Sequence, residues 1–262
     1  MFASKYLLYR ILGNDIPLRH QKGQTLRNLR RILEGEEGLK GLKMRWLLNR
    51  IADQEVQAQI IKLLDKYQQK YEVIPFNLGK FKRIPVDDLK SRTAELIGLN
   101  QARNKVLRQG QKLAEWTMVF DGNCFLTSQA WQEIIQAIES DQACRYGVVA
   151  MIRIIKGKPA VLSEPQLMFR FDANEKFDEA FEYGQDSKIE LLRRLNVSGV
   201  WDQWSDSLKK TRKKHKIEGS VCYAGHVLRL PSGNELAEKD IKIRKQLRDR
   251  GIIHLMNRID QW

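Results

Sequence analysis

Short apolar runs alternate with amphipathic segments over the first two thirds of the chain, and this alternation restricts the possible folds more than any other feature. Apolar runs rich in strand-forming residues lie at Lys5–Leu12, Trp46–Leu48, Tyr71–Phe76, Trp116–Phe120, Val148–Ile155 and Gln166–Phe171. Segments with helical spacing of apolar residues lie at about Thr25–Glu34, Asp53–Lys70, Arg92–Arg108 and Ser128–Glu139. Strands that alternate with helices in this way predict an α/β fold, with a mixed, mainly parallel sheet flanked by helices.

The alternation weakens after about Phe177, where charged helical segments precede a late strand near Val221–Leu230. Because no low-complexity linker interrupts the 262 residues, we expect a single domain over 1–262 with an irregular helical C-terminal part. Two local features are also predicted, a loop over Gly79–Asp88 and the end of the third helix at Gly110.

The charge balance predicts a polyanionic partner. Lys and Arg number 46 against 32 for Asp and Glu, which gives a net charge of +14. Such a surface attracts nucleic acid, anionic lipid or the phosphates of a nucleotide, and charge alone does not choose among them. No apolar run approaches the roughly 20 residues that span a bilayer, so membrane contact is expected only at the periphery.

Cysteine usage predicts a cytoplasmic protein. The chain has three cysteines, Cys124, Cys144 and Cys222, and no two of them have metal-ligand spacing. With this odd number, neither a disulfide framework nor a structural zinc site is expected, and a reducing compartment is the default. The N-terminus also lacks the features of a secretion signal, because Arg10 interrupts its apolar stretch.

Polar side chains follow three of the predicted strands. The clusters are Asn14-Asp15, Asn49-Arg50 together with Asp53, and Asp121-Gly122-Asn123. In open α/β sheets, ligands bind in the crevice beyond the carboxyl ends of the strands. Each cluster alone is also what ordinary turns and helix caps contain. Taken together, the three clusters favour a ligand-binding cleft.

Asp121-Gly122-Asn123 is the sharpest of these clusters, because it directly follows the strongly apolar segment Trp116–Phe120. Side chains at positions i and i+2 can turn toward one cation, and hard divalent cations prefer oxygen ligands and phosphate. A metal held there would neutralise a diphosphate leaving group as a Lewis acid.

These stretches resemble the GT-A glycosyltransferases, nearest to the family 2-like group that uses nucleotide-diphosphate sugars. The resemblance rests on four stretches, which run in the family's order between about residues 5 and 230: Tyr9 to Asn14, Asn49 to Asp53, the Gln101-Ala102-Arg103-Asn104 helix leading to Asp121-Gly122-Asn123, and Phe177 to Leu195 with Gly184-Gln185-Asp186. The resemblance implies a Rossmann-like GT-A domain, with a nucleotide-binding half at 1–125 and an acceptor-side half at 126–262. It also implies a transferase that moves a sugar from a nucleotide-diphosphate donor to a hydroxyl acceptor.

The resemblance further implies roles by position. The residues expected to bind the nucleotide sugar are Asn14, Asn49, Arg50, Asp53, Arg103, Asn104 and Asp121. Asp121, Asn123 and His226 would hold Mn²⁺ or Mg²⁺, with His254 in reserve. Asp186 would act as the general base on the acceptor hydroxyl.

Two departures from the family and several ordinary alternatives stand beside these roles. Asn123 replaces the second acid of the Asp-x-Asp motif and is a weaker metal ligand, and Gln185 replaces an acid before Asp186. Asp186 has an alternative role as the cap of a helix that begins near Ser187. His226 has a structural alternative, and Arg103 has a possible partner in Glu95 or in another acidic residue of its helix.

Lys209–Lys216 is the densest basic run. It is typical of a solvated loop, and its functional alternatives are a lid over the diphosphate or a contact with an anionic membrane. Trp201 and Trp204 precede the run and would serve either an acceptor sugar or the core. Two competing hypotheses remain, a nucleic-acid-binding protein and an inactive sugar-nucleotide-binding module. We do not expect nucleic acid binding, because no aromatic residue is interleaved with the basic run.

Overall fold

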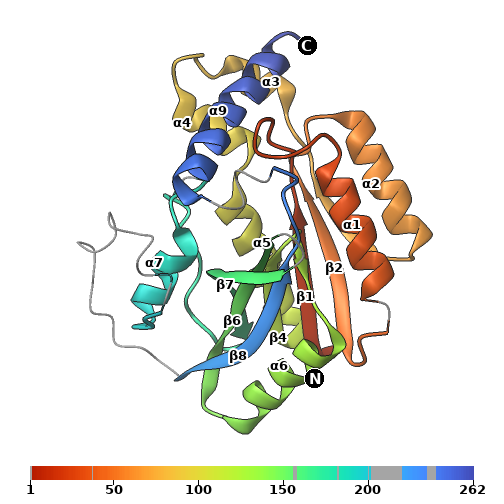
Figure 1. Ribbon diagram of the computed structural model, residues 1–262, viewed down its shortest axis with the longest axis vertical. Coiled ribbons are helices and arrows are strands. Elements are labelled where there is room, and N and C mark those ends of the chain that lie inside the picture. The colour runs from red at the N-terminus through yellow and green to blue at the C-terminus, as the bar shows by residue number, and fades with distance from the viewer. Residues whose placement is uncertain are drawn as a thin grey trace.

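The computed structural model describes residues 2–36, 38–155, 158–181, 183–199, 201, 220–234 and 240–262 (Figure 1). Within these residues the strands form one sheet in the order β3-β2-β1-β4-β7-β6-β8-β5. The strands are β1 (Ser4–Leu12), β2 (Leu42–Asn49), β3 (Lys70–Ile74), β4 (Ala114–Asp121), β5 (Cys124–Phe125), β6 (Cys144–Ile155), β7 (Lys158–Arg170) and β8 (Ser220–Arg229). Four of the strand pairings are parallel and three are antiparallel, which confirms the expected α/β fold with a mixed, mainly parallel sheet.

Helices cover both faces of the sheet and gather at one end of it (Figure 1). They are α1 (Gln24–Gly35), α2 (Gln54–Lys66), α3 (Leu78–Arg83), α4 (Leu89–Leu96), α5 (Leu99–Leu113), α6 (Ser128–Ser140), α7 (Ser187–Arg194) and α9 (Ile241–Asp260). In Figure 1, α3, α4 and α9 lie at the end of the sheet opposite to α6 and the N-terminus. This is the end toward which β1, β2 and β4 run, so these helices surround the carboxyl ends of the central strands.

The buried strand β1 divides the core, because successive side chains point to opposite faces of a sheet. Leu7, Tyr9 and Ile11 pack in one cluster with residues of α5 and α7. Leu8 packs with residues of α6 on the other face, and Leu12 packs there with residues of α1 and α2. Whether a β1 side chain contacts α5 or α6 therefore depends on whether it occupies an odd or an even position in the strand.

The expected element boundaries were wrong around the third predicted helix. The segment predicted to be a loop contains α3, whose first turn is capped by Asn77. The predicted single helix is broken into α4 and α5 at Gly98, which has a positive φ of 43°. Gly110 does not end α5, which continues to Leu113.

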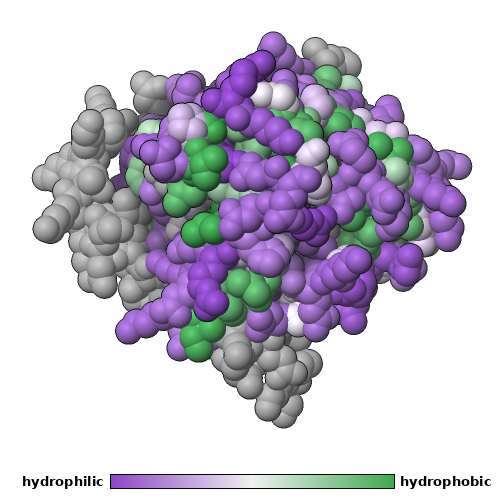
Figure 2. Space-filling view, turned by 90° about the horizontal axis from the view of Figure 1, so that it is seen from above, coloured by the Kyte–Doolittle hydropathy of each residue, from purple (hydrophilic) through white to green (hydrophobic). Residues whose placement is uncertain are grey.

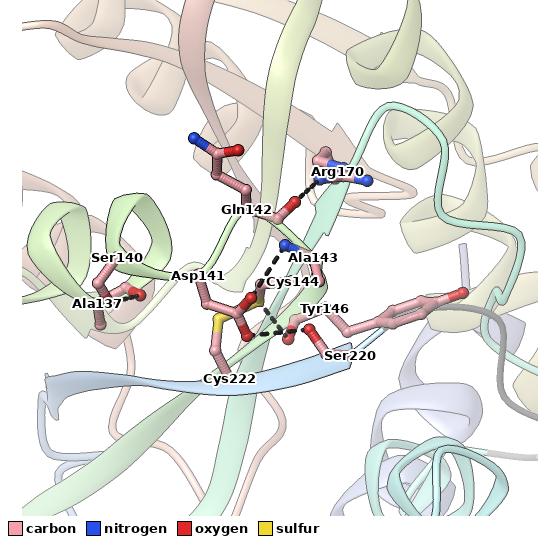
Figure 3. The surroundings of a disulfide bond; sticks show 10 residues. All are labelled: Ala137, Ser140, Asp141, Gln142, Ala143, Cys144, Tyr146, Arg170, Ser220 and Cys222. Carbon is pink, nitrogen blue, oxygen red and sulfur yellow. Dashed lines mark hydrogen bonds between the residues drawn. A yellow bond between two sulfur atoms is a disulfide. The ribbon is translucent and has the colours of Figure 1, made fainter.

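The structure also contradicts the expectation about cysteines, because Cys144 and Cys222 form a disulfide (Figure 3). The two residues are 78 positions apart in sequence, but β6 and β8 are hydrogen-bonded neighbours, and the two Cα atoms lie 5.9 Å apart. Spacing along the chain carries no information about such a pair, since the strand order alone brings the two thiols together.

The surface seen from above in Figure 2 is mainly hydrophilic, with small, separated hydrophobic groups. Every helix in the described ranges is too short or too polar to cross a lipid bilayer. The basic run Lys209–Lys216 and Trp204 lie outside the described residues, whereas Trp201 is buried in the core beside α7.

Gly110 allows α5 to approach β4 closely, and its replacement gives a test of this packing. A Cβ atom at position 110 would lie 2.3 Å from Cγ2 of the β-branched residue Thr117. We predict that Gly110→Ala lowers the free energy of unfolding by about 1–3 kcal/mol, measured by urea denaturation. The matched control is Gly79→Ala in α3, where the nearest atom is 3.6 Å away and alanine favours the helix. Equal stability of the two variants would contradict this account.

Candidate functional site

A cleft of about 420 Å³ lies beyond the carboxyl ends of β1, β2 and β4. Its walls also include the first turns of α5 and α7, the end of β8 and one face of α9. Cationic side chains outnumber carboxylates in the lining: the cations are Arg19, Arg103, Arg153, Arg229, Arg244, Lys245 and Arg248, and the carboxylates are Asp15, Asp121, Glu164 and Asp186. A concave site with this charge favours an anionic small molecule.

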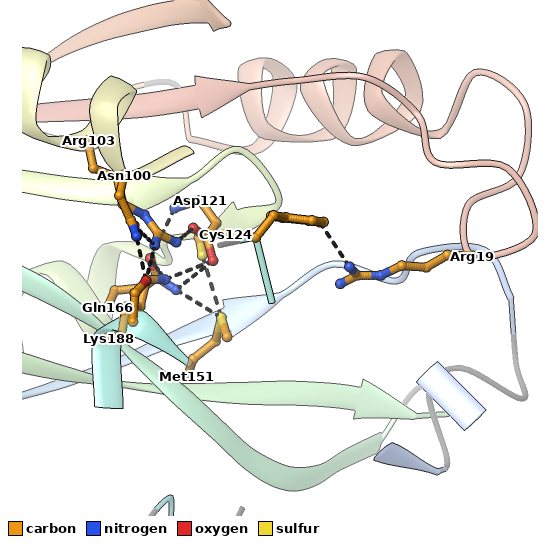
Figure 4. A network of polar contacts seen from close by, with 10 residues as sticks. Arg19, Asn100, Arg103, Asp121, Cys124, Met151, Gln166 and Lys188 are labelled. Atoms are coloured by element: carbon orange, nitrogen blue, oxygen red, sulfur yellow. Dashed lines mark hydrogen bonds and ion pairs between the residues drawn. The ribbon is translucent and has the colours of Figure 1, made fainter. Parts of the chain in front are cut away.

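Asp121 stands at the centre of a polar network at the end of β4 (Figure 4). Asp121 lies two positions after Val119 in β4, so both side chains point to the same face of the sheet, toward α5 and α7. Arg103 Nη2 lies 3.0 Å from Oδ1, and Lys188 Nζ lies 2.8 Å from Oδ2. The Asp121 backbone N–H donates to Gln166 Oε1 on β7 at 3.0 Å. Three elements distant in sequence therefore meet on one carboxylate.

The charges around Asp121 keep its carboxyl group ionised. Burial alone would raise its pKa, but the nearby charges of Lys188, Arg103 and Arg229 outweigh burial and hold the pKa far below the usual carboxyl range. Lys188 is completely buried, and its ammonium group also donates to Gln166 Oε1 at 3.0 Å. Asp121 is thus a fixed negative charge that is already paired with two cations.

The turn after Asp121 is held between β1 and β8. A Cβ atom at Gly122 would lie 2.6 Å from the backbone oxygen of Ile11, so only glycine fits against β1 here. The carbonyl oxygen of Asn123 accepts a hydrogen bond from the backbone N–H of Leu230 at 2.8 Å. Asn123 also lines the cleft. This turn fixes the end of β8, and therefore Arg229, beside Asp121.

Two of the expected nucleotide-binding asparagines line the cleft. Asn14 joins the ends of β1 and β2, because its amide donates to the carbonyl oxygen of Arg50 and accepts from the backbone N–H of Ala52, both at 2.8 Å. Asn49 donates to the carbonyl oxygen of Ile97 at 2.5 Å. Its Oδ1 is buried and has no hydrogen-bond partner among the described residues. This acceptor therefore stays unpaired in the part of the chain that the structure describes.

Three other expected nucleotide-binding residues do not line the cleft. Arg50, which has a positive φ of 51°, donates to Gln101 Oε1 at 2.8 Å. Asp53 caps α2 by accepting hydrogen bonds from two backbone N–H groups. Asn104 is buried, and its amide exchanges hydrogen bonds with the backbone of Phe177. Asp53 is thus an ordinary helix cap, whereas the side chains of Arg50 and Asn104 connect distant segments of the chain.

Asp186 lines the cleft at the start of α7 without capping it. It occupies the N-cap position with a left-handed backbone (φ 55°), and its side chain makes no capping hydrogen bond. Its carboxylate instead lies 3.6 Å from Lys245 Nζ of α9. Burial and then the charge of Glu164 raise its pKa, against the opposing effect of Lys245. A carboxylate with a raised pKa at a cleft wall is suited to accept a proton.

The residues expected to bind a divalent cation do not make a suitable site. His226 pairs with Glu133 of α6 at 3.4 Å and does not line the cleft, and His254 is exposed on α9. Both carboxylate oxygens of Asp121 already contact cationic side chains. Among the described residues, no group of three His, Cys, Asp or Glu side chains could hold a metal ion.

Several residues of the cleft and its network were not predicted from the sequence. Lys188 and Gln166 contact Asp121, and Arg153 and Arg229 line the cleft nearby. Only Arg153 and Arg229 could have been noticed in the sequence, since each places a charge within an otherwise apolar predicted strand. For Arg103, the expected alternative was pairing with Glu95, but Glu95 pairs with Lys80 at 2.5 Å instead.

Comparison with known proteins gives structural likenesses only. No protein-family model and no curated protein matches the sequence. The chain is similar to a mannosyltransferase from Pyrobaculum calidifontis in complex with GDP-Man and Mn²⁺, with 10% identity and a TM-score of 0.44 over 85% of this chain. It is also similar to a 4-diphosphocytidyl-2C-methyl-D-erythritol synthase, with 16% identity and a TM-score of 0.36 over 74% of this chain and 86% of that chain.

A third similar structure is Rv0371C from Mycobacterium tuberculosis in complex with manganese, with 13% identity and a TM-score of 0.33 over 94% of this chain and 99% of that chain. The chain spans 57% of the length of the mannosyltransferase. At these identities the likeness concerns the fold, and no activity of this chain follows from it.

The ion pairs of Asp121 predict a pH-dependent stability. Asp121→Asn leaves the buried ammonium of Lys188 without a carboxylate, so we expect a loss of about 3 kcal/mol in the free energy of unfolding at pH 7. Because the pKa of Asp121 is lowered by folding, the stabilisation is present above the unfolded pKa of about 4 and is lost as the pH falls below it. Urea denaturation at pH 7 and pH 3 measures this.

In that experiment, the difference in free energy of unfolding between wild type and Asp121→Asn should be smaller at pH 3 than at pH 7. The control is Asp87→Asn, because Asp87 is exposed in the turn between α3 and α4. A difference that stays constant with pH, or that Asp87→Asn reproduces, would show that the pairing does not stabilise the fold.

Proposed function

We propose that the protein is a glycosyltransferase that moves a sugar from a nucleotide-diphosphate donor, bound in the cleft, to a hydroxyl acceptor. One observation carries the proposal. Asn14, Asp121 and Asp186, which come from segments far apart in sequence, line a single cationic cleft at the carboxyl ends of the central strands. In open α/β sheets this is the position at which nucleotide ligands bind.

The donor's nucleoside is assigned to the side of the cleft formed by β1 and β2. The unpartnered Oδ1 of Asn49 supplies an acceptor for a ribose hydroxyl or a base N–H. The backbone around Asn14 is fixed by the hydrogen bonds of its amide, which keeps this wall rigid. The diphosphate is assigned to the cationic side, where Arg103 and Arg229 flank Asp121.

The acceptor is assigned to the side of Asp186. In the proposed reaction, the acceptor oxygen attacks the anomeric carbon while the bond from that carbon to the diphosphate oxygen breaks. The carboxylate of Asp186 takes the proton from the acceptor hydroxyl, and the electron pair of the broken bond leaves with the nucleoside diphosphate. Lys245 and Arg248, which line the same wall, keep the negative charge of the carboxylate balanced before the proton arrives.

The proposal is tested first by ligand binding. A panel of nucleoside diphosphates and their sugar derivatives, each measured with manganese, with magnesium and with EDTA, should contain at least one compound that raises the melting temperature of the protein. A ligand that binds only the folded state must do so. At one hundred times its Kd it adds about 2.7 kcal/mol to the free energy of unfolding. No stabilisation by any member of the panel would refute the proposal. Binding without transfer to any acceptor would instead identify a binding module.

The role of Asp186 gives a second prediction. Asp186→Asn should keep donor binding within a factor of two or three and lower the transfer rate by about 10²–10⁴-fold, because the acceptor proton loses its base. The raised pKa predicts that wild-type transfer declines with falling pH already above the usual Asp value of about 4. Asp87→Asn is the matched control. An Asp186→Asn variant with the wild-type rate would remove the assignment.

A further inference from the structure

Arg153 and Arg229 lie side by side in the wall of the cleft. They are register partners on the neighbouring parallel strands β6 and β8, and both line the cleft. Their exposed fractions are only 4% and 8%. Arginine is rarely buried to this extent without a partner, because an unpaired buried charge is costly.

Arg229 has no such partner among the described residues. Its Nε is buried without a hydrogen-bond partner, and its guanidinium makes no hydrogen bond or ion pair within 4.0 Å in that part of the chain. The carboxylate that influences it electrostatically is Asp121, which is already in direct contact with Arg103 and Lys188. The Nε–H of Arg229 is therefore a buried donor whose hydrogen-bonding capacity is not used by the described residues.

The backbone explains why Arg229 stays there. Cys124 of β5 pairs with Arg229, and the next residue, Leu230, donates its backbone N–H to the carbonyl oxygen of Asn123. The end of β8 is thus fixed to the turn that follows Asp121. This arrangement keeps a buried cation at the cleft at a cost in stability, which a bound anion would offset.

The local charge balance identifies the class of anion. One carboxylate, Asp121, faces three cationic side chains, Arg103, Lys188 and Arg229, which leaves two positive charges in excess. Arg153 adds a further cation beside Arg229, and the other carboxylates that line the cleft are Asp15, Glu164 and Asp186. One planar guanidinium group can donate two parallel hydrogen bonds to two oxygens of a phosphate. These bonds are more directional than those of an ammonium group.

We propose that Arg229, with Arg153 and Arg103 beside it, binds the diphosphate of the donor in the place where a divalent cation would otherwise be required, so that donor binding is independent of metal. This inference rests on the proposed function and specifies how that site takes its ligand. During transfer the bond between the anomeric carbon and the phosphate oxygen breaks, and its electron pair stays on that oxygen. Fixed guanidinium groups stabilise the charge that develops there without any rearrangement.

The test is calorimetric titration of the full chain with UDP, GDP and inorganic pyrophosphate, in EDTA and in manganese. Wild-type protein should bind at least one of these with the same affinity, within about threefold, in both conditions. Arg229→Gln should weaken that binding by about 10–100-fold, as expected for the loss of a charged hydrogen-bonding partner. The control Lys5→Gln removes the same charge at an exposed site paired with Glu139 and should leave binding unchanged.

A second readout separates ligand binding from a structural role. Because Arg229 is buried without a hydrogen-bonded partner in the described chain, Arg229→Gln should melt at the same temperature as the wild type or higher when no ligand is present. Arg229→Lys, which keeps the charge without the planar fork, should recover part of the affinity.

The outcomes distinguish the two proposals. Failure of every nucleotide to bind wild-type protein in either condition would overturn the proposed function, and this inference with it. Binding that requires manganese would overturn the inference alone. So would unchanged affinity in Arg229→Gln, or a lower melting temperature of that variant without ligand, since the guanidinium would then belong to the fold.

Discussion

The carboxylate of Asp121, shared by Arg103 and Lys188, connects the parts of the structure that form the cleft. It joins the end of β4 to α5 and to the first turn of α7, and Gln166 adds β7 through the backbone N–H of Asp121. These elements come from widely separated parts of the sequence, and hydrophobic packing fixes their distances only approximately. The ion pairs set them more closely, because they hold Arg103 and Lys188 within 3.0 Å of the two carboxylate oxygens of Asp121.

The same interaction changes how the Asp-x-Asp resemblance should be understood. In this chain the carboxylate of Asp121 already contacts two cationic side chains. Asn123, which has no carboxylate, stands where the motif has its second acid. The candidate ligand His226 pairs with Glu133 of α6, away from the cleft. Positive charge at the cleft is instead supplied by side chains fixed to strand ends and helix turns. Such charge requires no coordination geometry, and it explains why the cleft is cationic although its central residue is an acid.

The sequence predicted those features that depend on local patterns. Alternation of apolar runs and amphipathic segments gave the α/β fold, and strand β1 was placed to within one residue at its start. Polar residues at strand ends correctly indicated a cleft that contains Asn14, Asn49 and Asp121. Asp53 shows the limit of this reasoning, because a residue that follows a strand can equally cap the next helix, and here it does.

Features that depend on contacts between distant segments could not be predicted in this way. Lys188 lies in a charged helix of ordinary composition, and only the docking of α7 on β7, the neighbour of β4, brings it to Asp121. The disulfide between Cys144 and Cys222 follows from the adjacency of β6 and β8, and the position of Arg229 follows from its pairing with β5. In each case the strand order or the docking of a helix on the sheet, which no short motif encodes, decides which residues meet.

A structure of the protein with a bound nucleoside diphosphate, crystallised in the presence of EDTA, tests the central claim most directly. The account predicts the two phosphates against the guanidinium of Arg229, with the nucleoside toward Asn49 and with the contacts of Asp121 to Lys188 and Arg103 intact. Phosphates seated elsewhere, or a ligand that enters the cleft only when a metal ion displaces Lys188 from Asp121, would contradict it.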